Sequence, residues 1–256
     1  MKIAFKIQYK GTNYSGFQSQ KNANSIQDEL IRAFKGISVD NVQMNYSGRT
    51  DKGVHALGQV FDVVVSQDRS DMQWINGLNS NLPNDISVVD LDKVKDSFHS
   101  RFDAIDRTYS YLIFNSPSRN VLLDDFYYWE QAELDIKKMN EESKCLVGKN
   151  DLTSFRSLSC GSNNHVRNIK KIEINKLGNI IEIKIPANAF LQNMVRIIVG
   201  TLLEIGKYQI KIPLKEILES KDRNNAGTTV NPRGLIFLGP SYENITKLKP
   251  EKSPLI

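Results

Sequence analysis

The stretch "SGRTDKGVHALGQV", residues 47–60, places Arg49 and Asp51 two positions apart between Gly48 and Gly53. Glycine allows the backbone to bend sharply and to approach a ligand closely. The residues that follow, 54–65, alternate toward the pattern of a strand and end in "VFDVVV". The sequence therefore predicts a glycine-flanked turn that presents a charged pair just before the chain enters a sheet.

Two interpretations of Asp51 follow from this turn. An aspartate at such a position commonly forms an Asx-turn with its own backbone. Alternatively, Asp51 is a nucleophile in a partly dry cleft, which requires a nearby cation because burial raises the pKa of a carboxyl and a close arginine lowers it. The segment is not a phosphate-binding P-loop, since the order G-x-x-x-x-G-K-[ST] is missing.

A candidate cation lies in residues 190–206, "FLQNMVRIIVGTLLEIG", which predict a long and largely buried helix. Arg196 stands among its apolar residues, and an unpaired buried charge costs several kcal/mol. The only carboxylate of this helix, Glu204, is out of direct reach. The partner of Arg196 must then come from elsewhere, either in a structural ion pair or as Asp51.

Charge is unevenly distributed along the chain of 256 residues, whose net charge is +5. Residues 1–100 hold 11 basic and 11 acidic side chains, whereas 101–256 hold 23 basic and 18 acidic. A basic surface of this kind suits phosphates, although mildly basic proteins often bind no polyanion.

Several classes of protein are disfavoured by composition. No apolar run reaches the roughly 20 residues of a spanning helix, and the start "MKIAFKIQYKG" lacks the apolar core of a signal peptide. We therefore expect a cytoplasmic protein without a membrane segment. Cys145 and Cys160 are expected to be free thiols, and the three scattered histidines predict no metal site.

The periodicity of the chain predicts an α+β fold. Strands are expected at 3–9, 42–47, 54–65, 85–94 and 107–115, helices at 25–36, 71–79, 133–148 and 190–206, and a hairpin with a Gly-Asn turn at 169–186. We expect two similar ferredoxin-like halves, each an α/β layer with an antiparallel sheet, which join in one extended sheet with the active-site cleft between them. The expected domains are 1–104, with the Asp51 loop, and 105–256, with Tyr109, Arg196 and the basic surface.

The motifs of the chain resemble, over almost its full length, those of the TruA-type tRNA pseudouridine synthases. "YKGTNYSGFQSQ" is similar to the opening motif of that family, and "SGRTDKGVHALGQV" to its signature G-R-T-D-x-G-V-H-x-x-x-Q-V. The blocks "NSNLPNDISV", "FHSRFDAIDRTYSYLIFN", "DLTSFRS" and "NAFLQNMVRIIVGTL" match later family blocks in the same order. Lys10, Phe17 and Lys52 depart mildly from the family pattern.

The resemblance implies an isomerase that converts uridine to pseudouridine in the anticodon stem-loop of tRNA, at positions 38, 39 and 40. It implies no cofactor and no metal, and a homodimer with tRNA lying across both subunits. By the family pattern Asp51 is the catalytic nucleophile, Tyr109 packs on the target base, and Arg196 pairs with the aspartate. Arg49 is placed to enter the nucleic acid, and Leu235 corresponds to an apolar residue that lines the uracil pocket.

Other functions remain open at this point. One is a catalytically silent RNA-binding module on the same fold, and another is a sugar-processing hydrolase that uses Asp51. The combination of Asp51, Tyr109 and Arg196 argues against the first, because binding alone does not require a costly charge pair. The lack of a positioned acid partner argues against the second. His55 is expected to be structural, as a lone strand histidine commonly is.

Overall fold

The computed structural model of the chain describes residues 1–243 and 245–253. These residues form two compact units, one made of 1–107 with 236–252 and the other of 108–235 with residue 253. The domain division expected from the sequence, 1–104 and 105–256, remains a prediction about folding units. The grouping by contacts differs from it at 105–107 and at 236–252, which belong to the first unit. The second difference arises because β11 (Leu235–Ser241) pairs with a strand of the first unit.

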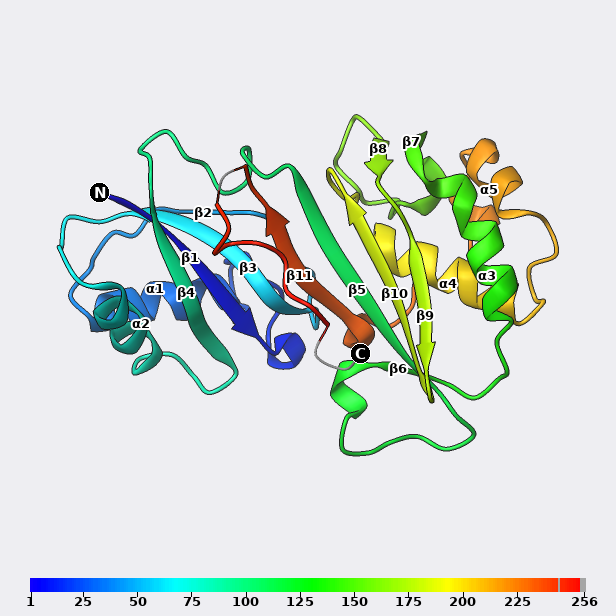
Figure 1. Cartoon of the computed structure of the whole chain (residues 1–256), viewed down its shortest axis with the longest axis horizontal. Coiled ribbons are helices and arrows are strands. Elements are labelled where there is room, and N and C mark those ends of the chain that lie inside the picture. The colour runs from blue at the N-terminus through cyan, green and yellow to red at the C-terminus, as the bar shows by residue number, and fades with distance from the viewer. Residues whose placement is uncertain (244, 254–256) are drawn as a thin grey trace. The chain divides into compact units, whose positions relative to one another are not determined.

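The first unit is built on a sheet whose strands are far apart in sequence (Figure 1). Its central strand β1 pairs antiparallel with β3 and β4, β2 extends along β3, and β11 runs parallel to β3. The bounds are β1 (Lys2–Tyr9), β2 (Met44–Tyr46), β3 (His55–Val64) and β4 (Ile86–Val94). Strands β1 to β4 lie where the alternation of the sequence predicts strands.

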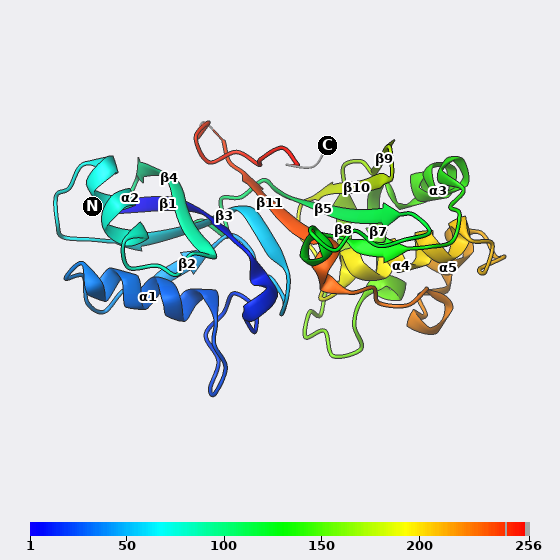
Figure 2. The same ribbon diagram turned by 90° about the horizontal axis from the view of Figure 1, so that it is seen from below.

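Helices α1 (Ile26–Gly36) and α2 (Asp71–Asn79) pack on one face of this sheet through an aromatic cluster (Figure 2). Phe5 of β1 stacks on Phe61 of β3 with centroids 5.3 Å apart and meets the edge of Phe34 of α1 at 5.6 Å. Trp74 of α2 closes the cluster 6.0 Å from Phe5. The hydroxyl of Ser25 accepts a hydrogen bond from the backbone of Asp28, which confirms the predicted helix start.

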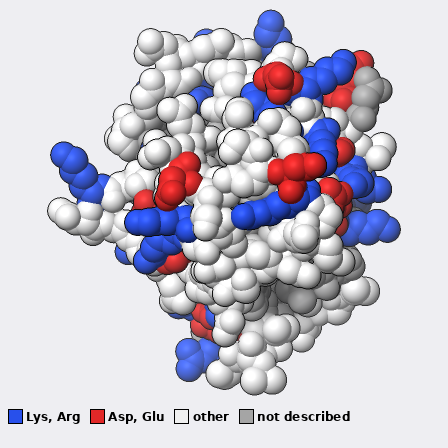
Figure 3. Space-filling view, turned by 90° about the vertical axis from the view of Figure 1, so that its left-hand side faces the viewer, with Lys and Arg blue, Asp and Glu red and all other residues white. Residues whose placement is uncertain are grey.

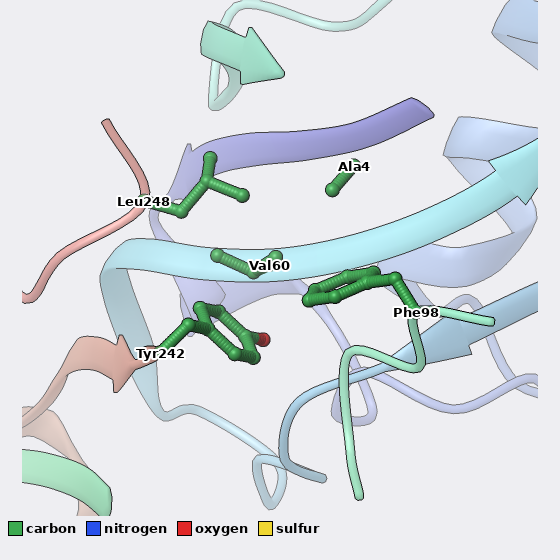
Figure 4. Close-up of a cluster of buried hydrophobic side chains, with 5 residues drawn as sticks. All are labelled: Ala4, Val60, Phe98, Tyr242 and Leu248. Carbon is green, nitrogen blue, oxygen red and sulfur yellow. The ribbon is translucent and has the colours of Figure 1, made fainter. Parts of the chain in front are cut away.

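The opposite face of the same sheet is covered by the C-terminal segment of the chain. Figure 4 shows Leu248 and Tyr242 packed with Ala4, Val60 and Phe98. These side chains lie on the other face because successive residues of a strand point to opposite sides. Leu248 is fully buried, so the C-terminal segment contributes to the core of the first unit through this side chain and Tyr242.

A buried lysine fastens this segment to the sheet. The ammonium of Lys6 is almost inaccessible to solvent, donates to the carbonyl of Lys249 at 3.0 Å and forms an ion pair with Glu251. The backbone of Glu251 also donates to the carbonyl of Leu238 in β11 at 2.9 Å. The segment is therefore held by hydrogen bonds and charge as well as by apolar contact. Residues 254–256 lie outside the described part of the chain.

The second unit contains a sheet in the order β5-β10-β8-β7, with β6 beside β5 and β9 beside β10. The predicted hairpin is confirmed: β9 and β10 are joined at Gly178 and Asn179, and Gly178 has the positive φ of 58° that such a turn requires. The bounds are β5 (Asp106–Asn115), β6 (Tyr128–Glu130), β7 (Gly148–Asp151), β8 (Val166–Ile169), β9 (Glu173–Leu177) and β10 (Ile180–Ala187).

The helices of the second unit are α3 (Ile136–Ser143), α4 (Met194–Gly206) and α5 (Leu214–Ser220), and α3 packs on α4 and β9. Two of them are shorter than the sequence pattern. Helix α3 begins after Asp135, whose carboxylate caps the backbone of Lys138 at 2.9 Å. Helix α4 begins after Asn193, because that residue adopts a left-handed conformation with φ of 61°.

The chain is thus a mixed α+β protein, as predicted from its periodicity. Short 3₁₀ turns complete it at Gly11–Asn13, Asp124–Phe126, Lys144–Leu146, Thr153–Phe155, Arg223–Asn225 and Pro232–Gly234. Within the described residues, no helix combines the length and apolar character needed to cross a bilayer.

The buried position of Leu248 leads to a stability prediction. Leu248→Ala should lower the free energy of unfolding by about 2–5 kcal/mol, because it leaves a cavity in the cluster beneath the C-terminal segment. Leu177→Ala is the matched control, since the side chain of Leu177 is 62% exposed. Urea denaturation of both variants measures the difference. Equal stability of the two variants would show that the C-terminal segment does not contribute to the core.

Candidate active site

Asp51 lies in the loop that connects β2 to β3, and its side chain is half-buried, whereas Arg49 and Lys52 are exposed. The carbonyl of Asp51 accepts a hydrogen bond from the backbone of Val54 at 3.2 Å, which closes a turn around Gly53. Gly53 has a φ of 78°, a conformation that a side chain disfavours. The glycine is therefore required by the turn itself, as the sequence predicts.

One side of this loop is held by the segment that follows β1. The backbone of Phe17 donates to the carbonyl of Thr50 at 3.1 Å, and the hydroxyls of Tyr9 and Thr50 lie 2.7 Å apart. A side chain at Gly16 would place its Cβ 2.8 Å from the Thr50 carbonyl oxygen, and one at Gly11 would overlap the carbonyl of Val54. The two segments approach so closely that only glycine fits at both positions.

The other side is held by buried side chains from the loop's own strand. Gln59 of β3 is fully buried, and its amide donates to the Gly48 carbonyl and accepts from the Ser47 hydroxyl, both at 2.6 Å. The Nδ1 atom of His55 accepts from the backbone of Gly11 at 3.1 Å, which is the structural role expected for this histidine. Asp51 therefore sits on a loop whose backbone is fixed in place before any ligand binds.

Arg196 lies in the first turn of α4, a helix whose other residues are almost all buried. The arginine itself is half-buried rather than buried. Its Nε atom donates to the carbonyl of Val230 at 2.7 Å and its Nη1 atom to the side-chain oxygen of Asn193 at 2.9 Å. Both of these acceptors are neutral, and the two bonds orient the guanidinium.

Tyr109 lies in β5 and is 8% exposed, with its ring edge-on to Phe190 at 4.8 Å. Tyr111, two residues further on the same face of the strand, donates its hydroxyl to the carbonyl of Asn231 at 2.7 Å. Burial raises the pKa of Tyr111, and the positive charge of Arg196 acts against this rise. Tyr111 is thus close to Arg196, and it lies in the same strand as Tyr109.

Leu235 is buried and begins β11 directly after Gly234. A side chain at Gly234 would place its Cβ 2.9 Å from the ring of Tyr111 and within 2.5 Å of the Leu112 carbonyl oxygen. The close packing of this glycine on β5 places the start of β11 beside Tyr111.

The candidate residues fall into two groups. Asp51 and Arg49 share one loop of the first unit, and Tyr109, Arg196 and Leu235 belong to the second unit, around Tyr111. The sequence reasoning did not identify Tyr111 or Gln59. Two features of the sequence could have identified them: the alternating tyrosines of "RTYSY" for Tyr111 and the glutamine of the signature for Gln59. Among the described residues, no group of three or more His, Cys, Asp or Glu side chains is arranged to hold a metal ion.

Comparison with known proteins identifies a family. The model of the family described as tRNA pseudouridine synthase matches residues 6–103 and 143–243. These ranges contain Asp51, Arg49, Arg196 and Leu235, whereas Tyr109 lies in the segment between them.

Curated relatives cover nearly the whole chain. The tRNA pseudouridine synthase A of Hydrogenovibrio crunogenus is 41% identical over 241 residues, which is 94% of this chain and 92% of the relative. The protein of the same name from Francisella philomiragia is 42% identical over 238 residues, which is 93% of this chain and 92% of the relative. A chain from the crystal structure of a Cbf5-Nop10-Gar1 complex aligns over 92% of this chain and 58% of its own, with a TM-score of 0.35 and 9% identity, too low to carry an argument.

Both the family match and the identity extend across the two units and include the loop of Asp51. The activity that goes with them is that of a tRNA pseudouridine synthase, which is an isomerase. The chain belongs to the tRNA pseudouridine synthase family.

Proposed function

We propose that this chain isomerises uridine to pseudouridine in the anticodon stem-loop of tRNA, at positions 38, 39 and 40, with Asp51 as the nucleophile. The observation that carries the proposal is the half-buried carboxylate of Asp51 on a loop fixed by Thr50, Gly48 and Gln59. A pre-set carboxylate is what a reaction at a sugar carbon requires.

The reaction rearranges one nucleotide without loss of atoms. The N1–C1′ bond of uridine breaks, the uracil turns, a C5–C1′ bond forms, the C5 proton leaves and N1 gains a proton. No electron donor or acceptor enters this balance. A carboxylate suits the first step because C1′ becomes electron-poor as the bond to N1 breaks. Asp51 acts by attack on C1′, by attack on uracil C6 or by removal of a 2′ proton, and all three routes need its ionised form.

We propose that Arg196 is the cation that keeps Asp51 ionised. A carboxylate and a guanidinium about 4 Å apart interact by roughly 4 kcal/mol at an effective dielectric constant near 20. The position of Arg196 in the first turn of α4 supports this role, because the N-terminal end of a helix also favours negative charge. The bonds to Val230 and Asn193 would hold the guanidinium in one orientation while it serves the carboxylate.

The remaining candidates are proposed to hold the target nucleotide. A base inside a stem must be flipped out at a cost of a few kcal/mol before it reacts. Arg49 is exposed next to Asp51 and is suited to enter the opened helix. Tyr109 is proposed to pack on the uracil and to help move the C5 proton, and Leu235 to line the pocket. Phe190, edge-on to Tyr109, supports the ring of that tyrosine.

The assembly is part of the same proposal. We infer two ferredoxin-like halves, folding as 1–104 and 105–256, whose antiparallel sheets join and whose cleft holds the site. A homodimer would bind tRNA across both subunits in the cytoplasm. The excess of basic residues in 101–256 supports binding to phosphates. The face of the protein in Figure 3 instead shows acidic and basic side chains interspersed, which does not favour a continuous phosphate contact there.

The first experiment replaces the nucleophile. Asp51→Asn should abolish tritium release from tRNA that carries uridine tritiated at C5, while tRNA binding stays nearly intact, because the amide is isosteric and cannot act as a nucleophile. Asp40→Asn, an exposed aspartate of the same unit, is the control and should react at the wild-type rate. Turnover by Asp51→Asn at a comparable rate would refute the assignment.

A second experiment tests the cation. Arg196→Met should lower both the rate of tritium release and the free energy of unfolding, since it leaves the carboxylate without its counter-charge and removes the bonds to Val230 and Asn193. The control is Arg223→Met, because the guanidinium of Arg223 also donates to a backbone carbonyl of the second unit, that of Ala226 at 3.1 Å. Full activity of Arg196→Met would rule out the proposed pairing.

A further inference from the structure

We propose that residues 99–102 of the first unit form a binding site for an unpaired RNA nucleobase and its phosphate, with Phe102 as the stacking surface. Arg101 and His99 flank the ring of Phe102, and we call these three residues the stacking platform. The inference rests on the proposed function, because it assigns a second nucleotide contact to the same substrate.

The exposure of Phe102 is the first observation. Its side chain is 74% exposed, whereas Phe5, Phe17, Phe34 and Phe61 of the same unit are fully buried. A large aromatic ring in water forgoes the stabilisation that burial gives. Packing in the core of the unit does not explain why this ring is exposed. We infer that the ring is exposed because it contacts a ligand.

The second observation is that the platform is held rigidly. The backbone of His99 donates to the Asp103 carboxylate at 2.9 Å, and the backbone of Arg101 donates to Nδ1 of His99 at 3.1 Å. The buried Ser100 donates its backbone N–H to Asp62 at 2.7 Å. An ordered aromatic surface loses little conformational entropy when a base stacks on it.

The third observation is that an imidazole ring and a guanidinium group lie beside the ring of Phe102. The ring of His99 lies 4.3 Å from that of Phe102, and the guanidinium carbon of Arg101 is 5.8 Å from its centroid. Burial raises the pKa of Tyr46, and the charges of Arg49 and Arg101 both oppose this rise. The guanidinium of Arg101, which lies over the ring, is the group that a phosphate beside the platform would meet.

The platform is connected to the loop of Asp51 through one side chain. Arg107 donates from Nε to the carbonyl of Ser47 at 3.0 Å, from Nη1 to the carbonyl of Ala104 at 3.0 Å, and from Nη2 to the carbonyl of Arg101. The platform and the loop thus keep a fixed relation within the first unit. A strand whose target base has been flipped out leaves neighbouring bases unstacked, and one of these is the occupant we assign to Phe102.

A single exposed ring beside an arginine fits a nucleobase better than a protein surface. Aromatic stacking combined with a cationic groove is the usual way in which proteins bind single-stranded nucleic acid. The only carboxylate of residues 99–103, that of Asp103, already accepts the backbone N–H of His99. The guanidinium of Arg101 lies beside the stacking surface and supplies the positive charge of the platform.

The test compares Phe102→Leu with Phe102→Trp in the background of Asp51→Asn, so that binding is measured without turnover. The probe is an anticodon stem-loop RNA with 2-aminopurine beside the target uridine. Phe102→Leu should raise its Kd about 5- to 100-fold and abolish quenching of the fluorescent base, whereas Phe102→Trp should retain both. Leu158→Ala, another exposed apolar side chain at 79% exposure, is the control and should bind as the parent does.

The outcomes separate this inference from others. An unchanged Kd for Phe102→Leu, or equal weakening by leucine and tryptophan, would overturn the stacking role. Release of a dimer into monomers by Phe102→Leu, measured by gel filtration without RNA, would identify a contact between copies instead. Urea denaturation should show no change in stability, since the ring is exposed. If the wild-type chain releases no tritium while Phe102 still governs binding, the proposed reaction fails and the stacking site stands.

Discussion

The close approach of the segment after β1 to the loop of Asp51 is the constraint on which the site depends. At Gly11 and Gly16 the two backbones meet so tightly that any side chain would collide with Val54 or Thr50. This contact fixes the loop from one face, and Gln59 fixes it from the other through Gly48. A carboxylate held in this way loses its conformational entropy during folding. Little further entropy is lost when a nucleotide binds.

In the second unit, the side chain of Tyr111 holds neighbouring segments together, as Gln59 does in the first unit. Tyr111 is anchored through its hydroxyl to Asn231, packs against the space that Gly234 leaves, and lies near the charge of Arg196. The carbonyl of Val230 and the side chain of Asn193 orient Arg196. Tyr109, two residues before Tyr111 on the same strand, packs edge-on against Phe190.

Local patterns in the sequence predicted much of the fold and only part of the site. The range 71–79 and the Gly-Asn hairpin were predicted correctly, because alternation and turn chemistry are local properties. Strand β11 was not, since its pairing with β3 joins residues about 180 positions apart in the chain. Asp51 could be found from its glycines and motif, whereas the roles of Gln59 and Tyr111 exist only through tertiary contacts. The pairing of Asp51 with Arg196 is non-local in the same sense and therefore stays a prediction.

Arg107 shows how one residue type can join these elements. Its guanidinium donates to carbonyls of Ser47, Ala104 and Arg101, which belong to the signature loop and to the segment that carries Phe102. Only the planar fork of an arginine offers several donors in fixed directions, and a lysine would supply a single point charge on a flexible stem. The same residue opens the motif "RTYSY", near the start of β5. The arginine of that motif therefore has a structural role within the first unit that is independent of any contact with RNA: it joins the loop of Asp51 to residues 101–104.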